Sequence, residues 1–488
     1  MNSVQRILSR VSLQPNTKSE PQQEPSLNEE NLIKFRDGDL DNPENWSLAR
    51  KRYVSAVAVL LSMNGNISSS IMAGSTQSVT QEFNVSRVAT ALTTSLFLLG
   101  LCAGPLVFCS LTEFYGRQCI LYITFLLYFA SLFLTAWPPN FGGLLVGRFI
   151  AGSFAAGPST IVAGILADLW KDCACGIAMG IFTCASWVGP ALGTVISGVV
   201  ELKKDWHWGT YVCLWLAAFS LFPMFTIPET HSDTILSQKA KLARNQGYNI
   251  QSGQEASKPK LTQLYKIALT RPWMLLLDII SFLCCIYSCI IAALQYMLFS
   301  IYPIVFQEMR GWNAAVSQLP ILGQAVGAFF ALLIVLVNTK RRKRRVSRGN
   351  QTVPEDHMVL AMIGGIGFPI SMLWLSWSAQ CDSVNWVVPT IGGTVLSTCL
   401  MLIQVSCFSY VTDAYSANYT ASVVAINIVV RCFSSAAAPL FTVQMFQALG
   451  IGEGGSLISG VAALLSVTPF LFYHYGHIIR SKSKYALS

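Results

Sequence analysis

The chain has 488 residues, of which 53% are hydrophobic and only 12% are charged. An ordinary soluble protein is about 25% charged, and a soluble fold of this length could not cover its surface with so few ionic groups. We therefore exclude a soluble enzyme. The formal net charge of +9 is interpreted as membrane topology rather than as a sign of nucleic-acid binding.

Apolar windows long enough to cross a bilayer follow a polar N-terminal segment. A membrane helix needs about 20 mostly apolar residues. Such windows are expected near residues 53–73, 88–110, 119–137, 141–167, 176–200, 209–227, 273–303, 314–338, 358–378, 385–411, 420–447 and 456–476. They predict an all-α polytopic membrane protein with 12 transmembrane helices.

A polar stretch between the sixth and seventh windows divides the chain into two groups of six helices. We predict a disordered cytosolic tail over 1–50 and a second cytosolic tail over 480–488. Between them we predict an N-terminal six-helix bundle over 51–227, a cytosolic central loop over 228–271 and a C-terminal six-helix bundle over 272–479.

The distribution of basic residues predicts the orientation of the chain. With the N-terminus inside, 22 lysines and arginines fall at cytosolic ends and loops, and 4 fall in external loops. Cytosolic loops carry the excess of Lys and Arg, so both termini are expected in the cytosol. Asn84 then lies in an external loop, where the sequence Asn84-Val85-Ser86 makes it a candidate glycosylation site.

Two arginines lie inside the apolar windows, Arg148 in the fourth and Arg431 in the eleventh. Each costs about 2.5–3.5 kcal/mol to insert, so neither is expected to face lipid. Each is either a cavity group that binds substrate or responds to a proton, or a structural arginine bonded to carbonyl groups of a neighbouring helix. Asp278, near the start of the seventh window, joins Arg148 as a candidate for proton coupling; the alternative is a carboxylate that stabilises the helix dipole.

Polar side chains in the first and seventh windows are expected to face the protein interior, because amides that face lipid are disfavoured. The candidates for lining a central cavity are Asn64, Gln295, Tyr296 and Arg431. No phosphate-binding loop, nucleophile–base pair or metal-ligand spacing is present in the sequence. We therefore expect no enzymatic activity, no metal and no cofactor.

Three motifs occur in order along the first half of the chain. They are Leu111-Thr112-Glu113-Phe114-Tyr115-Gly116-Arg117, Arg148 with Gly152, and Gly189-Pro190-Ala191-Leu192-Gly193 with Gly198. Together they resemble the major facilitator superfamily, specifically the fungal twelve-helix drug:proton antiporters that include multidrug, polyamine and secondary-metabolite exporters. The resemblance implies the major facilitator fold, with its 12 helices in two six-helix bundles.

The resemblance also implies roles for individual residues. Arg148 would be linked to proton coupling. The gating motif would consist of Glu113, Gly116, Arg117 and Asp168. The helix-five motif, thought to kink its helix and to limit leak, would consist of Gly189, Pro190, Gly193 and Gly198.

The function implied is secondary active export of a small amphipathic compound (a drug, toxin or secondary metabolite) by proton antiport with alternating access. One alternative is a transporter of a small organic anion, because two buried arginines face almost no buried carboxylate. A second alternative is a non-transporting membrane sensor. The expected partners are a small-molecule substrate, protons and membrane lipids, without nucleic acid. We expect a monomer in the plasma membrane, with the vacuolar membrane as the alternative location.

Overall fold

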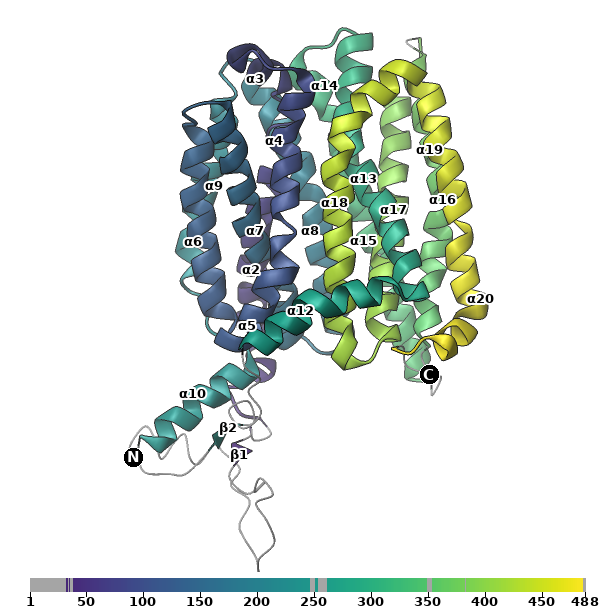
Figure 1. Ribbon diagram of the computed structural model, residues 1–488. Helices are drawn as coiled ribbons and strands as arrows, with labels where there is room; N and C mark the ends of the chain where they lie inside the picture. Colours follow the sequence, from purple (N-terminus) through teal and green to yellow (C-terminus); the bar gives the residue numbers. More distant parts are fainter. Residues whose placement is uncertain are drawn as a thin grey trace, which may run out of the picture.

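The structure is a computed structural model. It describes residues 32–33, 35, 38–245, 251–252, 261–348, 353–381 and 383–485. Most of the predicted tail over 1–50 lies outside the described residues. Within the described part, two helical bundles stand side by side (Figure 1).

The N-terminal bundle is formed by helices that run back and forth between two ends. Its long helices are α2 (Leu48–Ser70), α4 (Arg87–Gly100), α6 (Arg117–Ala136), α7 (Phe141–Leu169), α8 (Asp172–Glu201) and α9 (His207–Met224). A short π-helix, η3 (Gly104–Phe108), joins α4 to α5 (Cys109–Tyr115), so these three elements form one span. Helix α3 (Thr76–Phe83) lies across one end of the bundle.

The C-terminal bundle repeats this pattern. Its long helices are α13 (Ile279–Pro303), α15 (Leu322–Val346), α16 (Met358–Gln380), α17 (Val387–Ala414), α18 (Ala417–Leu449), α19 (Ile451–Leu465) and α20 (Val467–Lys482). Shorter elements extend or join them, namely η4 (Ile304–Met309), α14 (Ala314–Gln318), η5 (Leu319–Ile321) and η6 (Pro354–His357). Helices α19 and α20 together form the last span.

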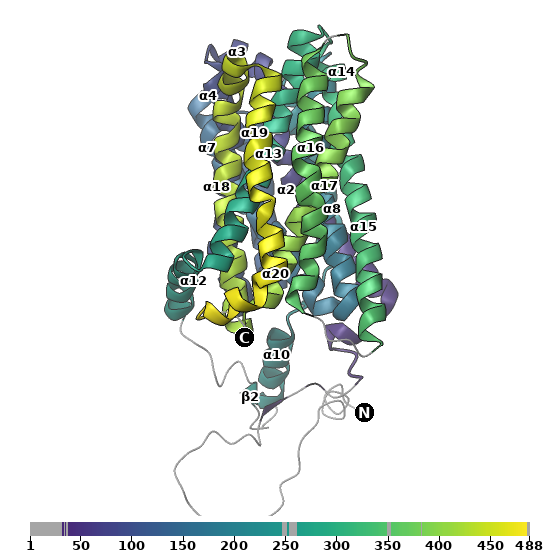
Figure 2. The ribbon, with the colours of Figure 1, turned by 90° about the vertical axis from the view of Figure 1, so that its right-hand side faces the viewer.

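The two ends of the bundles differ. We call the end where α2 begins and α20 finishes the terminal end, and the end that carries α3 and α14 the far end (Figure 1). Two further helices belong to the terminal end: α10 (Ser232–Arg244) projects away from the bundles, and α12 (Leu261–Leu276) lies across them (Figures 1 and 2).

A small cluster attaches α10 to the segment that precedes α2. The ammonium group of Lys239 lies 3.1 Å from a carboxylate oxygen of Asp39 and 2.9 Å from one of Asp41. Nearby, the two-residue strands β1 (Leu32–Ile33) and β2 (Gln251–Ser252) pair in parallel, and η2 (Pro43–Asn45) leads into α2.

Ten helical spans among the described residues are long and apolar enough to cross a membrane. Of the twelve predicted helices, α2 and α9 do not meet this criterion. Helix α2 is rich in Ser and Asn near its far end, and α9 begins with His207-Trp208-Gly209-Thr210-Tyr211, which lowers the mean hydropathy of its 18 residues. Both nevertheless pack inside the N-terminal bundle. Helix α2 packs against α7 and α8, and helix α9 packs against α6. The fold class is as predicted, and the count of twelve stays a prediction.

The seventh helix begins later than predicted. The window over 273–303 included residues that belong to α12, and α13 begins only at Ile279. Between the two helices Asp278 adopts an extended backbone conformation (φ −72°, ψ 132°), which ends one helical direction and starts another. Helix α12 therefore extends beyond the central loop that was predicted over 228–271.

The outer surface of the bundles is apolar, as a lipid-facing surface requires. Phe222, Leu464, Phe219 and Ile370 are between 61% and 79% exposed. Polar residues gather inside instead, and many buried serines and threonines donate to a carbonyl oxygen three or four residues earlier, as Thr124 and Ser220 do. This arrangement is the reverse of that in soluble proteins, because the hydrocarbon around a membrane protein offers no hydrogen bonds to polar groups.

Candidate functional site

A cavity of about 1370 Å³ lies between the two bundles. Ligand pockets typically measure about 300–1,000 Å³, so this one could hold a compound of drug size together with water. Charged residues at the terminal end, among them Glu113, Arg117, Lys343 and Asp413, line its mouth. The cavity therefore opens at the terminal end.

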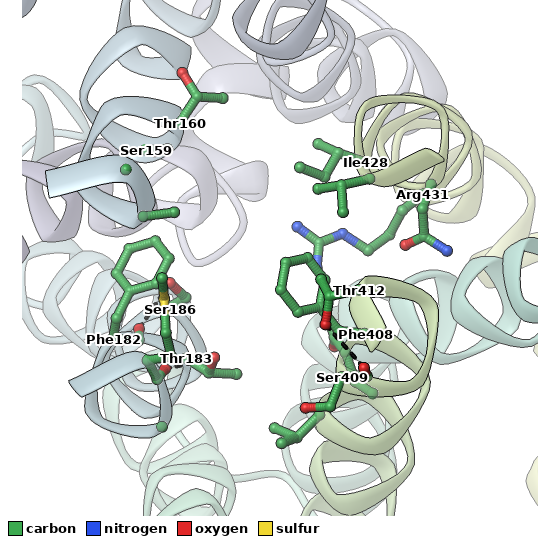
Figure 3. A pocket seen from close by; sticks show the side chains of 18 of the residues that line it. Ser159, Thr160, Phe182, Thr183, Ser186, Phe408, Ser409, Thr412, Ile428 and Arg431 are labelled. Atoms are coloured by element: carbon green, nitrogen blue, oxygen red, sulfur yellow. Dashed lines mark hydrogen bonds between the residues drawn. The ribbon is translucent and has the colours of Figure 1, made fainter. Parts of the chain in front are cut away.

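The interior of the cavity combines aromatic rings with small polar groups. Figure 3 shows Phe182 and Ser186 of α8 on one wall, facing Phe408 of α17 and Arg431 of α18 on the other. Further inside lie the amides and hydroxyls of Asn66, Gln295, Tyr296, Gln404, Asn427 and Ser435. An apolar pocket with a few convergent polar groups is the usual setting for binding a small organic molecule.

Arg431 is one of the two intramembrane arginines, and it reaches into this cavity (Figure 3). No hydrogen bond or ion pair joins its guanidinium group to any residue that the structure describes; only its carbonyl oxygen is engaged, by Ser434 Oγ at 2.8 Å. The positive charge is therefore directed at whatever occupies the cavity.

Arg148 is enclosed by protein. It is 1% exposed and does not line the cavity. Its Nη2 donates to the carbonyl oxygen of Ser68 at 2.8 Å, and its Nε donates to that of Thr93 at 3.1 Å. The guanidinium also stacks over the ring of Phe97 at 4.5 Å. Arg148 thus joins α7 to α2 and α4. This is the geometry of a structural arginine bonded to carbonyl groups of neighbouring helices, not that of a group exposed in the cavity.

Two other predicted residues lie away from the cavity. Asp278 sits just before α13 and accepts hydrogen bonds from the hydroxyls of Tyr415 and Ser483, so it connects the start of α13 to α17 and the C-terminal segment. Asn64, predicted to line the cavity, instead donates to Ser220 Oγ at 2.9 Å and attaches α2 to α9. The other three cavity candidates, Gln295, Tyr296 and Arg431, do line it.

The gating motif forms a clamp at the terminal end of the N-terminal bundle. Gly116 joins α5 to α6 in a left-handed conformation (φ +93°) that favours glycine. Arg117 then forms a two-pronged ion pair with Asp168 at the end of α7. Glu229 accepts hydrogen bonds from the backbone N–H groups of Arg117 and Gln118 at 3.0 and 3.2 Å, which caps the N-terminus of α6.

Sequence reasoning did not assign Glu229 to the site. The available signal was its position in Pro228-Glu229-Thr230, directly after the sixth window. A carboxylate there can reach the free N–H groups at the start of a neighbouring helix, where negative charge is stabilising.

The C-terminal bundle has a corresponding clamp at the same end. His357, just before α16, lies with Nε2 2.9 Å from Asp413 Oδ2 at the end of α17, and Arg342 of α15 lies 2.5 Å from the same nitrogen. Glu355 pairs with Arg480 of α20 at 2.9 Å. Histidine thus takes the place in this bundle that Arg117 has in the other.

The helix-five motif packs α8 closely against two neighbours. A Cβ on Gly189 would lie 2.6 Å from Asn66 Cβ of α2, and Ser70 Oγ of α2 donates to the carbonyl oxygen of Pro190 at 2.6 Å. At Gly193 a Cβ would overlap the α2 backbone. At Gly198 it would meet Gln318 of α14, in the opposite bundle, at 2.7 Å. The motif therefore contributes to the contact between the bundles.

Contacts between the bundles close the far end. Arg87 at the start of α4 pairs with Glu308 of η4 at 2.7 Å. Deeper in, Ser69 of α2 and Tyr296 of α13 share a hydrogen bond of 3.1 Å at the inner end of the cavity. Asn84, the glycosylation candidate, is exposed at this far end as the left-handed residue that terminates α3.

Comparison with known proteins identifies the family. Residues 55–439 match the Major Facilitator Superfamily. The chain belongs to this superfamily.

Similar relatives are fungal transporters. The chain is 34% identical over 93% of its length to the major facilitator superfamily multidrug transporter mdrA of Aspergillus fumigatus, and covers 76% of that protein. It is 35% identical, also over 93% of its length, to the MFS-type efflux pump MFS2 of Trichophyton rubrum, with 77% of that protein covered.

A solved structure supports the fold. The proton:xylose symporter XylE bound to 6-bromo-6-deoxy-D-glucose matches with a TM-score of 0.64 at 15% identity, over 88% of this chain and 96% of that one. At this identity the likeness concerns the fold alone. Within the part of the chain that the structure describes, no group of three or more His, Cys, Asp or Glu side chains could hold a metal ion.

The two intramembrane arginines of this major facilitator should differ in their effect on stability. Arg148→Gln leaves carbonyl oxygens of α2 and α4 without their charged donor, which costs about 1–3 kcal/mol per unsatisfied buried group, so we expect a melting temperature lower by several degrees. Arg431→Gln removes no hydrogen bond to a described residue, so its melting temperature should be close to that of the wild type. Thermal unfolding of the purified proteins in detergent measures both. Equal melting temperatures for the two variants would contradict the clamp assigned to Arg148.

Proposed function

We propose that this protein exports small amphipathic compounds, such as drugs or secondary metabolites, by proton antiport with alternating access. The observation that carries the proposal is the large, mostly apolar cavity between two bundles, open at one end and closed by inter-bundle contacts at the other. The printed names of the relatives, a multidrug transporter and an efflux pump, support export rather than uptake.

We further propose that the terminal end faces the cytosol, because the basic residues concentrate there. Lys343 and Arg342 line the cavity mouth beside the basic run at the end of α15. The structure would then be the inward-open state, ready to take substrate from the cytosol. We propose a monomer in the plasma membrane, with its apolar outer side chains against lipid, and we assign it no enzymatic activity.

For the proton we distinguish two groups of residues. Glu113, His357 and Asp413 are titratable and line the cavity, where water and substrate reach them. Arg148 and Asp278 do not line it. Those two would influence coupling through the helices that they join.

Transport in proteoliposomes tests the proposal. The purified protein is reconstituted and supplied with three fluorescent amphipaths that share a pyrene body and differ in charge. An acidic lumen should drive accumulation of at least one of them severalfold above protein-free vesicles, and a protonophore should abolish the difference. Accumulation that ignores the direction of the pH gradient would exclude proton antiport, and the absence of protein-dependent movement of any probe would exclude export of this class of compound.

Locking the far end should stop transport. A Cβ on Gly198 would lie 3.2 Å from Gln318 Cβ, slightly closer than the separation of about 3.5–4.5 Å in a disulfide, so a small movement of α8 away from α14 admits the bond. After mild oxidation, a Gly198→Cys/Gln318→Cys variant should therefore cross-link α8 to α14 and lose transport, because the cavity can no longer open at that end. A reducing agent should restore the activity, and the two single variants serve as controls. Full transport by a protein whose cross-link is verified by mass spectrometry would contradict alternating access.

A further inference from the structure

Arg431 is a cation on the inner cavity wall, and its bonding capacity is unused among the residues that the structure describes. Arg431 presents a guanidinium group with five N–H donors, and none of them is bonded to a residue that the structure describes. A guanidinium group matches a carboxylate or similar oxyanion through two parallel hydrogen bonds. An arginine held open in a cavity within the membrane therefore has the chemistry of an anion receptor.

The charges around Arg431 favour an anion as well. The acidic side chains on the described cavity wall are Glu113 and Asp413, and both lie at the mouth. Asp413 is already paired with His357 at 2.9 Å. Deeper in, the lining consists of aromatic, aliphatic, amide, hydroxyl and thiol groups around Arg431. A cleft lined by one sign of charge between low-dielectric walls concentrates ligands of the opposite sign.

The surroundings of Arg431 also set the shape of the ligand. Phe408 and Ile428 lie beside the guanidinium, and Phe182 faces it across the cavity (Figure 3). An apolar body can lie between these side chains while its anionic group contacts Arg431.

We propose that the preferred substrates are amphipathic oxyanions, in which a carboxylate or sulfonate binds Arg431 and an aromatic or aliphatic body packs between α8 and α17. This inference rests on the proposed export function and narrows its substrate class. It also revises the sequence-based argument that two buried arginines attract an anion. Of these two, Arg431 faces the cavity, whereas the guanidinium group of Arg148 is bonded to carbonyl oxygens. A cationic compound of the same size would be repelled.

Equilibrium binding to the purified full-length protein tests this inference independently of transport. The probes are pyrenebutanesulfonate, pyrenebutanol and a pyrenebutyl trimethylammonium salt, which share one apolar body. A hydrogen bond to a charged group contributes about 1.5–3 kcal/mol, so the wild type should bind the sulfonate about tenfold or more tightly than the alcohol, and the ammonium compound most weakly.

Three variants separate the role of Arg431 from general effects. Arg431→Gln should lose the advantage of the sulfonate while binding the alcohol as the wild type does, and Arg431→Glu should reverse the preference toward the ammonium compound. Lys340→Gln is the matched control, because it removes one positive charge from the end of α15, outside the residues that line the cavity, and leaves Arg431 intact; its preference should stay close to that of the wild type. Melting temperatures verify that each variant is folded.

The outcomes are distinct. Equal binding of the three probes by the wild type would overturn the inference even if no variant folded, and so would an equal loss of all probes in a folded Arg431→Gln protein. Selective binding of the sulfonate without transport in proteoliposomes would support the anion site and contradict the export function. Transport of all probes alike, without a preference in binding, would support export and overturn the anion site.

Discussion

The cost of placing a charge in hydrocarbon governs this structure. A charged side chain at the bilayer centre loses water and must find either protein partners or an aqueous cavity. The two arginines in the apolar spans illustrate the two solutions. Arg148 is enclosed by carbonyl oxygens of α2 and α4, whereas Arg431 projects into the space between the bundles. The first joins three helices of one bundle, and the second places a positive charge in the interior of the cavity.

The ends of the bundles follow from the same constraint. Ion pairs that would be costly in the middle of the membrane lie at the two ends, where water reaches them. At the terminal end they remain within each bundle, as between Arg117 and Asp168 and between His357 and Asp413. At the far end the pair of Arg87 and Glu308 connects one bundle to the other. Such an arrangement leaves the cavity open at one end and closed at the other, as alternating access requires.

The sequence predicted the spans well because hydropathy is a local property. The window over 141–167 corresponds to α7 at Phe141–Leu169, and the window over 358–378 to α16 at Met358–Gln380. Asp278 was less well placed, since the apolar residues that end α12 look like part of the next span. Its partners Tyr415 and Ser483 come from distant parts of the chain, which no local pattern reveals.

The different roles of Arg148 and Arg431 could not be predicted from the sequence either. Arg148 and Arg431 each stand in an apolar run, so their local signals are alike, and the two readings had to stay open for both. What separates them is tertiary: which helices approach and whether those helices offer carbonyl oxygens. Asn64 was mistaken for a cavity residue for the same reason, since Asn66, two positions later, faces the cavity instead.

Hydrogen exchange measured by mass spectrometry on the reconstituted protein tests most directly whether the bundles alternate. In the resting state, peptides around Arg87, Glu308 and Gln318 at the far end should be protected, and those at the cavity mouth around Asp413 should exchange faster. Adding a transported compound should raise exchange at the far end and lower it at the mouth. Changes of the same sign at both ends, or at neither, would contradict a cavity that opens to one side at a time.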